Sequence, residues 1–119
     1  MSLTIDVREA GDVCILDLHG RITLGVASAL LRDEIREMLD SGHRNILLNM
    51  ADVSYIDSSG LGQLVGSFAT VAHRGGHLKL LNLGKRVNEL MQVTKLHTVF
   101  EAHTSETAAL RSFSAAAHG

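Results

Sequence analysis

The first twenty-five residues alternate between apolar and polar positions in the manner of a β-hairpin and a loop. Residues 3–7 have an apolar side chain at every second position, which is typical of a strand with one buried face. A turn at residues 11–12 leads into residues 13–18, which are more continuously apolar. The pattern predicts two antiparallel strands, followed by a polar loop over residues 20–25 that is bounded by glycines.

A helical period begins after this loop. Apolar residues recur every three or four positions over residues 26–40, so they share one face of a predicted helix, and Gly42 is typical of its C-terminus. Residues 45–50 form a short, mainly apolar run. Such a run is typical of a central strand that is covered on both faces.

The rest of the chain continues this alternation of helices and strands. The pattern predicts a helix over residues 61–72, a strand over 77–83, a short helix around 87–91, a strand over 98–100 and a helix over about 104–113. Helices between successive strands imply parallel neighbours. We therefore predict a single α/β domain over residues 1–119, with its core over about 3–113. Its mixed, mostly parallel sheet should have about five strands packed against about four helices.

The composition excludes several classes of function. The formal net charge is −2 and the pI is about 6.4, so no strongly basic surface is available for nucleic acid or for an anionic membrane. Aromatic residues make up only 3% of the chain, too few for platforms that stack unpaired bases. We therefore expect neither a nucleic-acid partner nor attachment to a membrane.

The compartment is predicted from cysteine usage and from apolar runs. Cys14 is the single cysteine and lies in an apolar run, so we expect a buried thiol rather than a disulfide. The chain opens without a signal-peptide pattern, and no apolar run approaches the roughly 20 residues of a membrane span. These features favour a soluble cytoplasmic protein. The near-neutral charge and the lack of a heptad repeat favour a monomer.

Candidate chemistry is concentrated in the segment DSSGLG, residues 57–62, between the third predicted strand and the second helix. Asp57 or a serine before a helix is a common N-cap, and glycines permit a tight turn there. A nucleophilic serine instead requires Gly-x-Ser-x-Gly, which neither Ser58 nor Ser59 has. A nucleotide-binding loop requires another glycine spacing, although helix N-terminal amides can hold an anion. An N-cap explains one polar residue here, but not three in succession.

A modification site also accounts for the hydroxyl groups. A serine at a helix N-terminus, at the carboxyl edge of a sheet, lies at the surface within reach of a kinase. Phosphorylation adds about −1.5 to −2 charges, which the helix amides tolerate. We therefore expect the fold to survive phosphorylation. A partner docked on the same surface would meet a new dianion beside Asp57 and dissociate.

Residues 49–62, NMADVSYIDSSGLG, closely resemble the signature segment of bacterial anti-sigma factor antagonists. These proteins belong to the STAS domain family (sulfate transporter and anti-sigma factor antagonist). The resemblance covers nearly the whole chain, including the opening hairpin, the loop at Gly20, the turn at residues 75–76 and the last two helices. It implies the family fold, a small mixed sheet packed against helices, in agreement with the pattern above.

The resemblance also implies roles for individual residues. In the family, the partner anti-sigma factor is a serine kinase that phosphorylates the serine directly after the aspartate, which is Ser58 here; Ser59 corresponds to a hydroxyl that is not the usual acceptor. The unphosphorylated antagonist binds the kinase and frees the sigma factor, the phosphorylated form dissociates, and a PP2C-type phosphatase restores it. The resemblance thus implies a regulator that is not an enzyme and needs no cofactor. The implied partner surface comprises Arg21, Thr23, Asp57, Ser58, Ser59, Gly60, Leu61 and Gly62.

One loop departs from the family pattern. Many members carry Gly-Glu-Leu-Asp after the second strand, where this chain has Gly20-Arg21-Ile22-Thr23. In family members this loop lies beside the phosphorylated serine and contributes to the partner surface, so the surface should be less negative here. Two alternatives stay open: a STAS-type scaffold in another kinase and phosphatase complex, and a small nucleotide-binding protein.

The histidines offer one further candidate site. His73 and His77 have the spacing of a helical metal-binding pair, but two glycines lie between them and should end the helix. No third ligand stands at a matching spacing. We therefore expect exposed histidines at a turn and no metal site.

Overall fold

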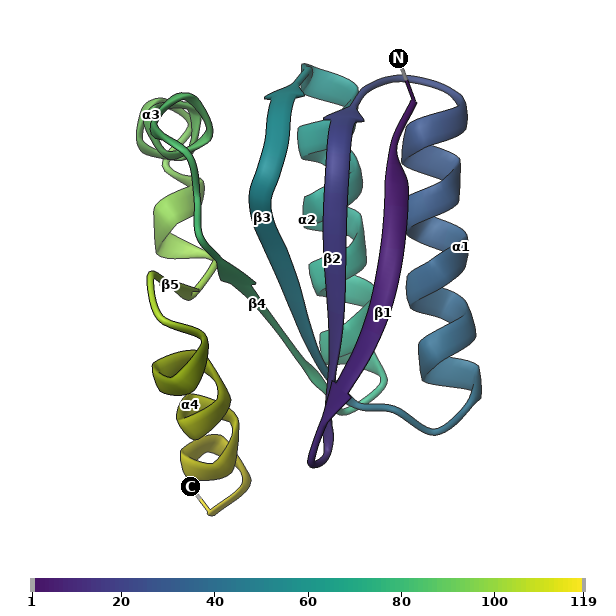
Figure 1. Cartoon of the computed structure of the whole chain (residues 1–119), viewed down its shortest axis with the longest axis vertical. Coiled ribbons are helices and arrows are strands. Elements are labelled where there is room, and N and C mark those ends of the chain that lie inside the picture. Colours follow the sequence, from purple (N-terminus) through teal and green to yellow (C-terminus); the bar gives the residue numbers. More distant parts are fainter. Residues whose placement is uncertain (1, 119) are drawn as a thin grey trace.

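The computed structural model describes residues 2–118 and shows one sheet whose strands lie side by side in chain order (Figure 1). The first two strands form the predicted antiparallel hairpin, and each later strand is parallel to its predecessor. The prediction of a mixed, mostly parallel α/β sheet is confirmed. The strands are β1 (Thr4–Ala10), β2 (Val13–Ile22), β3 (Asn45–Ile56), β4 (His77–Leu81) and β5 (Ala102–His103).

Helices connect the parallel strands and cover the sheet on both faces. The described residues form α1 (Val26–Asp40), α2 (Ser58–His73), α3 (Lys85–Val93), the short 3-10 helix η1 (Leu96–Thr98) and α4 (Glu106–His118). Helices α1 and α2 lie side by side, with α2 behind β2 and α1 beside β1 in the view of Figure 1, whereas α4 lies beside β4 and β5. Four α-helices agree with the prediction.

Alternation along β2 explains why the sheet separates two apolar clusters. Leu16 and Leu18 belong to the larger cluster beneath α1 and α2, whereas Ile15 belongs to a smaller cluster that includes Phe113 of α4. Successive side chains of a strand point to opposite faces, so a strand that is covered twice must be apolar at nearly every position. Cys14 is fully buried in the larger cluster, as predicted.

The predicted strand over residues 98–100 is wrong. Lys95 has a positive φ of 65°, and the chain then forms η1, whose last residue is Thr98. This turn directs Phe100 into the core, where its ring lies edge-on to that of Phe68 with 5.3 Å between the ring centres. The last strand comes later, at Ala102–His103. Apolar side chains alone do not distinguish a strand from a turn that buries one aromatic ring.

Strands β2 and β3 are both longer than predicted. β3 continues to Ile56 instead of ending near residue 50, and β2 continues through Arg21 into the predicted loop. In this extension Arg21 pairs with Tyr55, after two shifts of register between the strands. One shift lies at Gly20, which has a φ of +115° and would bring an added Cβ onto the Ser2 carbonyl. The extension carries Tyr55 to the edge of the sheet where α2 begins.

Within residues 2–118, we find no helix whose length and apolar character would let it cross a bilayer.

The smaller apolar cluster, which includes Phe113, should anchor α4 to the sheet. Phe113 is only 1% exposed, and the Lys79 ammonium lies 4.7 Å from its ring centre. Phe113→Ala should lower the free energy of unfolding in urea by about 3–5 kcal/mol, because it leaves a cavity between α4 and the sheet. Arg111→Ala, at an exposed position of the same helix, should change it by less than about 0.5 kcal/mol. Equal effects of the two substitutions would contradict the anchoring role of Phe113.

Candidate functional site

The Asp57 carboxylate joins the start of α2 to the loop between β2 and α1. Asp57 is the N-cap of α2, and its Oδ1 accepts a hydrogen bond from the Gly60 amide at 2.7 Å. Its Oδ2 accepts one from the Leu24 amide at 3.0 Å. The predicted N-cap is therefore confirmed, and the second bond places the β2–α1 loop directly beside the DSSGLG segment.

These hydrogen bonds also set the charge of Asp57. Hydrogen bonds from the Gly60 amide first, and from the Leu24 amide second, hold the pKa of the Asp57 carboxyl below its usual value. Backbone amides stabilise the charged form of a carboxylate, and the positive end of a helix dipole acts in the same direction. Asp57 is therefore ionised at neutral pH, next to Ser58.

The two serines have different environments. Ser58 is the first residue of α2 and is exposed, and it lines a groove beside the helix. Ser59 is half-buried and does not line that groove. The structure thus presents the hydroxyl-bearing residue directly after the aspartate and partly covers its neighbour.

The two glycines of the segment also differ. Gly60 is buried, and a Cβ there would overlap the Ile22 carbonyl oxygen at the end of β2. The same carbonyl accepts a hydrogen bond from the Asp57 amide at 3.3 Å. Gly62 is exposed, and a Cβ there would have no neighbour within 4 Å. Gly60 is therefore a packing position that lets α2 approach β2, whereas Gly62 lies at the surface.

The remaining residues expected at the site also divide into positions that pack within the protein and positions at its surface. Leu61 is 8% exposed and belongs to the larger apolar cluster, although its edge reaches the groove. Arg21 is exposed, and its guanidinium carbon lies 4.8 Å from the centre of the Tyr55 ring. Thr23 is half-buried, and its carbonyl accepts hydrogen bonds from the amide and the hydroxyl of Ser28 at 3.2 and 2.7 Å. Arg21 therefore lies at the surface, and Thr23 positions the start of α1.

A groove of about 630 Å³ lies between the start of α2 and helix α3. Tyr55, Ser58 and Leu61 line one side, and α3 contributes other side chains, including Arg86 and Val93. No residue of α3 was expected at the site. The structure reveals the role of α3: Val93 is an apolar residue at the end of this helix, yet it is 80% exposed.

The charged side chains that line the groove are Asp57, Arg86 and Glu89. No histidine or cysteine is among its lining residues, so Ser58 has no imidazole beside it there, and among the described residues the only carboxylates lining the groove are those of Asp57 and Glu89. Within the described part of the chain, no cluster of histidine, cysteine and carboxylate side chains could hold a metal ion. His73 and His77 are both exposed, as predicted.

The two glycines give a matched pair of predictions. Gly60→Ala should lower the free energy of unfolding by about 1–3 kcal/mol, because the methyl group meets a backbone oxygen that cannot move freely. Gly62→Ala should instead raise it by about 0.5–1 kcal/mol, because alanine favours the helix and meets open space. Urea denaturation of both variants checks this. Equal effects would contradict the close approach of α2 to Ile22.

The depressed pKa of Asp57 predicts a dependence of stability on pH. A carboxylate with a lowered native pKa contributes stability that is present above its unfolded-state pKa and is lost as the pH falls through the native pKa. Asp57→Asn keeps an oxygen acceptor but removes the charge. The advantage of the wild type over this variant should be largest at neutral pH and should shrink in acid, measured by thermal unfolding. A difference that does not depend on pH would contradict a stabilising charge at this N-cap.

Comparison with known proteins identifies the family of this chain. The model of the STAS domain family matches residues 4–109. The anti-sigma-B factor antagonist of Bacillus subtilis (strain 168) is 32% identical over 101 residues, which are 85% of this chain and 91% of that protein.

Solved structures show the same fold. A Thermotoga maritima protein, described as a candidate anti-sigma factor antagonist, has a TM-score of 0.85 at 23% identity, over 92% of this chain and 93% of that one. SpoIIAA of Bacillus has TM-scores of 0.69 in its unphosphorylated form and 0.70 in its phosphorylated form, at 20% and 23% identity. Each alignment covers 91% of this chain, and 96% and 98% of the two SpoIIAA chains. Because the family model spans the hairpin, the DSSGLG segment and the first turn of α4, the chain belongs to the STAS domain family.

Proposed function

We propose that this chain is an anti-sigma factor antagonist, and that phosphorylation of Ser58 switches off its binding to an anti-sigma factor. The observation that carries the proposal is the exposed Ser58 at the first position of α2, beside a groove. The chain shares 32% identity with a protein named as an anti-sigma-B factor antagonist. The unphosphorylated form binds the anti-sigma factor kinase in the cytoplasm, and the sigma factor is released.

The position of Ser58 suits a kinase substrate better than the position of Ser59. A kinase must bring the acceptor hydroxyl in line with the transferred phosphoryl group, so the acceptor has to protrude from the surface. Ser58 is exposed and Ser59 is half-buried. We therefore assign the phosphate to Ser58, and its removal to a phosphatase of the PP2C type.

Phosphorylation at this position changes binding more than folding. The first amides of a helix have no partners within the helix, and they favour a nearby anion. A partner seated on the groove would have to exclude water from a dianion that lies next to the Asp57 carboxylate and the apolar Leu61 and Val93. Desolvation of a dianion beside a carboxylate is costly, so the partner dissociates while the α/β body remains folded.

The alternative functions lack such support. A serine hydrolase would need a base near Ser58, and the groove offers no histidine. We therefore infer a regulator rather than an enzyme. A constitutive scaffold would have the same fold, and it differs from the proposed switch only in never being phosphorylated at Ser58.

Incubation with a purified anti-sigma factor kinase of the source organism and ATP tests the proposal. We expect one phosphate, mapped to Ser58 by mass spectrometry, and none on the Ser58→Ala variant. Ser59→Ala is the matched control, because it removes the adjacent hydroxyl and should still be phosphorylated.

The same product tests the effect on binding. The phosphorylated protein should keep its far-ultraviolet circular dichroism and lose at least about tenfold in affinity for the kinase, as expected for an unpaired charge at an interface. Phosphate on another residue, with an active kinase, would overturn the assignment to Ser58. Unchanged affinity after phosphorylation would favour the scaffold.

A further inference from the structure

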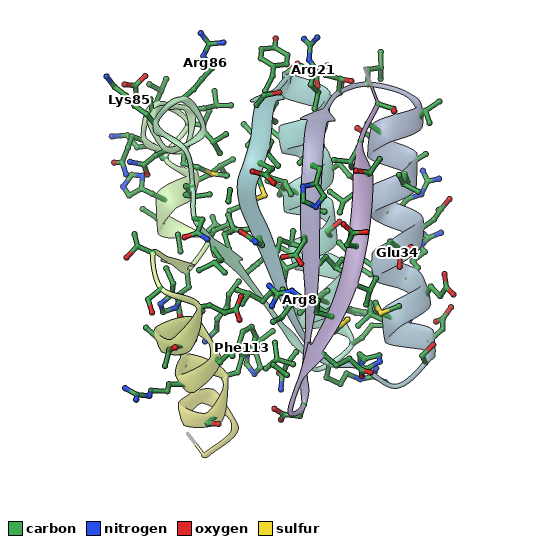
Figure 2. The ribbon with its side chains drawn as sticks, in the orientation of Figure 1. Arg8, Arg21, Glu34, Lys85, Arg86 and Phe113 are labelled. Carbon is green, nitrogen blue, oxygen red and sulfur yellow. The ribbon has the colours of Figure 1, made fainter. Side chains whose placement is uncertain are left out.

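The end of the molecule around Ser58 carries a group of basic side chains. Arg21 extends from the end of β2, and Lys85 and Arg86 extend from the start of α3, all toward the same end of the molecule (Figure 2). Arg86 lines the groove together with Ser58, and Arg21 lies over the Tyr55 ring of the same groove. The whole chain has a formal charge of −2. The basic side chains at this end therefore have the opposite sign of charge to the molecule as a whole.

Arg21 contacts the Tyr55 ring, but none of the three cations is neutralised by a carboxylate among the described residues. Some basic residues elsewhere form ion pairs with carboxylates, among them Arg8 with Asp17, Arg74 with Asp40 and Lys79 with Glu101. Arg36 and Arg111 form none among the described residues, so what distinguishes this end is that three such cations lie together there. Within residues 2–118, no ion pair involves Arg21, Lys85 or Arg86.

Two carboxylates lie near the same groove. Asp57 is already bound to two backbone amides, and Glu89 of α3 lies one turn beyond Arg86. Three cations against two carboxylates leave the groove end with an excess of positive charge.

Exposed apolar side chains lie on both sides of Ser58. Leu24 and Val26 are 76% and 79% exposed, and the loop that carries them is bonded to Asp57 through the Leu24 amide. Val93, which is 80% exposed, lies across the groove on α3. Large apolar side chains with such exposure are common at surfaces that bind another protein.

We propose that this end of the molecule binds a segment of the anti-sigma factor that carries acidic side chains next to apolar ones. The proposal rests on the function proposed above. It defines a docking surface of six residues that surround Ser58: Arg21, Leu24, Val26, Lys85, Arg86 and Val93. The cations of this surface would pair with carboxylates of the partner. The three exposed apolar side chains would contact apolar side chains that lie between those carboxylates in the partner segment.

This surface explains how a single phosphate can release the partner. Ser58 and Arg86 line the same groove, and a guanidinium binds phosphate with two parallel hydrogen bonds. A phosphate on Ser58 therefore competes with the partner's carboxylates for the same cations. It also repels those carboxylates. Phosphorylation thus changes the net charge of the surface from positive to negative, and the phosphate also occupies space on it.

Binding of the unphosphorylated chain to the purified kinase, measured at several salt concentrations, tests this surface. The double variant Arg21→Gln and Arg86→Gln should bind about tenfold more weakly, because each exposed ion pair contributes about two- to fivefold. The loss should come mainly from slower association, and the remaining affinity should depend less on salt. The matched control, Arg36→Gln and Arg111→Gln, makes the same change in charge at exposed positions of α1 and α4 and should bind as the wild type does.

A second pair of variants tests the apolar part. Leu24→Ser should weaken binding several-fold, because the side chain is lost while the amide that bonds Asp57 remains. Val7→Ser, at a 44% exposed position of β1, is the control and should have no effect. Thermal unfolding confirms that each variant is folded.

The outcomes separate this inference from the proposed function. If the wild type binds the kinase and the basic double variant binds equally well, or no worse than its control, the docking surface is wrong while the proposed function stands. If the wild type binds no anti-sigma factor kinase of the source organism, both are overturned. Weaker kinase binding by the basic double variant and by Leu24→Ser, with unchanged binding by their two controls, supports the docking surface.

Discussion

The site is held in place by contacts between the start of α2 and the end of β2. The Asp57 carboxylate bonds the Gly60 amide within the helix and the Leu24 amide in a loop 33 residues away in the sequence. Beneath it, Gly60 lies against the Ile22 carbonyl, which also accepts the Asp57 amide. Without these contacts, neither the direction of Ser58 nor the position of the exposed Leu24 would be fixed. The surface proposed to meet a partner is therefore set by backbone hydrogen bonds rather than by flexible side chains.

The body behind this surface resists distortion because it is packed on both faces. Leu16 and Leu18 fill one side of β2 and Ile15 fills the other, so the central strands are buried between helices. Even the buried ammonium of Lys79 is satisfied, by Glu101 at 3.1 Å and by the Ser112 hydroxyl at 2.9 Å. A change of charge at Ser58 therefore affects the surface around Ser58 and leaves the packed core unchanged. The switch that we propose needs no movement of the core.

Local patterns in the sequence were sufficient for most of the fold. The alternation at residues 3–7 and the helical period at residues 26–40 depend on near neighbours, and both predictions are confirmed. The strand predicted around Val99 failed because the positive φ of Lys95 turned the chain and buried the next aromatic ring. No local pattern marks such a turn in advance.

The candidate site was only half visible in the sequence. Asp57 and Ser58 are adjacent, and the resemblance to a family pointed directly to them. Arg86 and Val93 are about 30 residues away in the chain and reach the groove only because α3 follows a parallel strand. The register that places Arg21 on Tyr55 depends on two irregularities between β2 and β3, which side-chain periodicity does not reveal.

The order of the strands has one further consequence. Strands β2, β3 and β4 are parallel and adjacent, so the connections that follow them all emerge at one edge of the sheet and lead into α1, α2 and α3. Each connection is at most three residues long, and most of its side chains lie outside the apolar clusters, although Leu83 packs against the larger one. Exposed side chains in these connections, such as Leu24, can therefore be exchanged without disturbing the core, whereas Asp57 cannot, because its carboxylate holds the start of α2. Duplicated copies of the chain that differ only in such side chains would then bind different partners and act in separate signalling pathways of one cell.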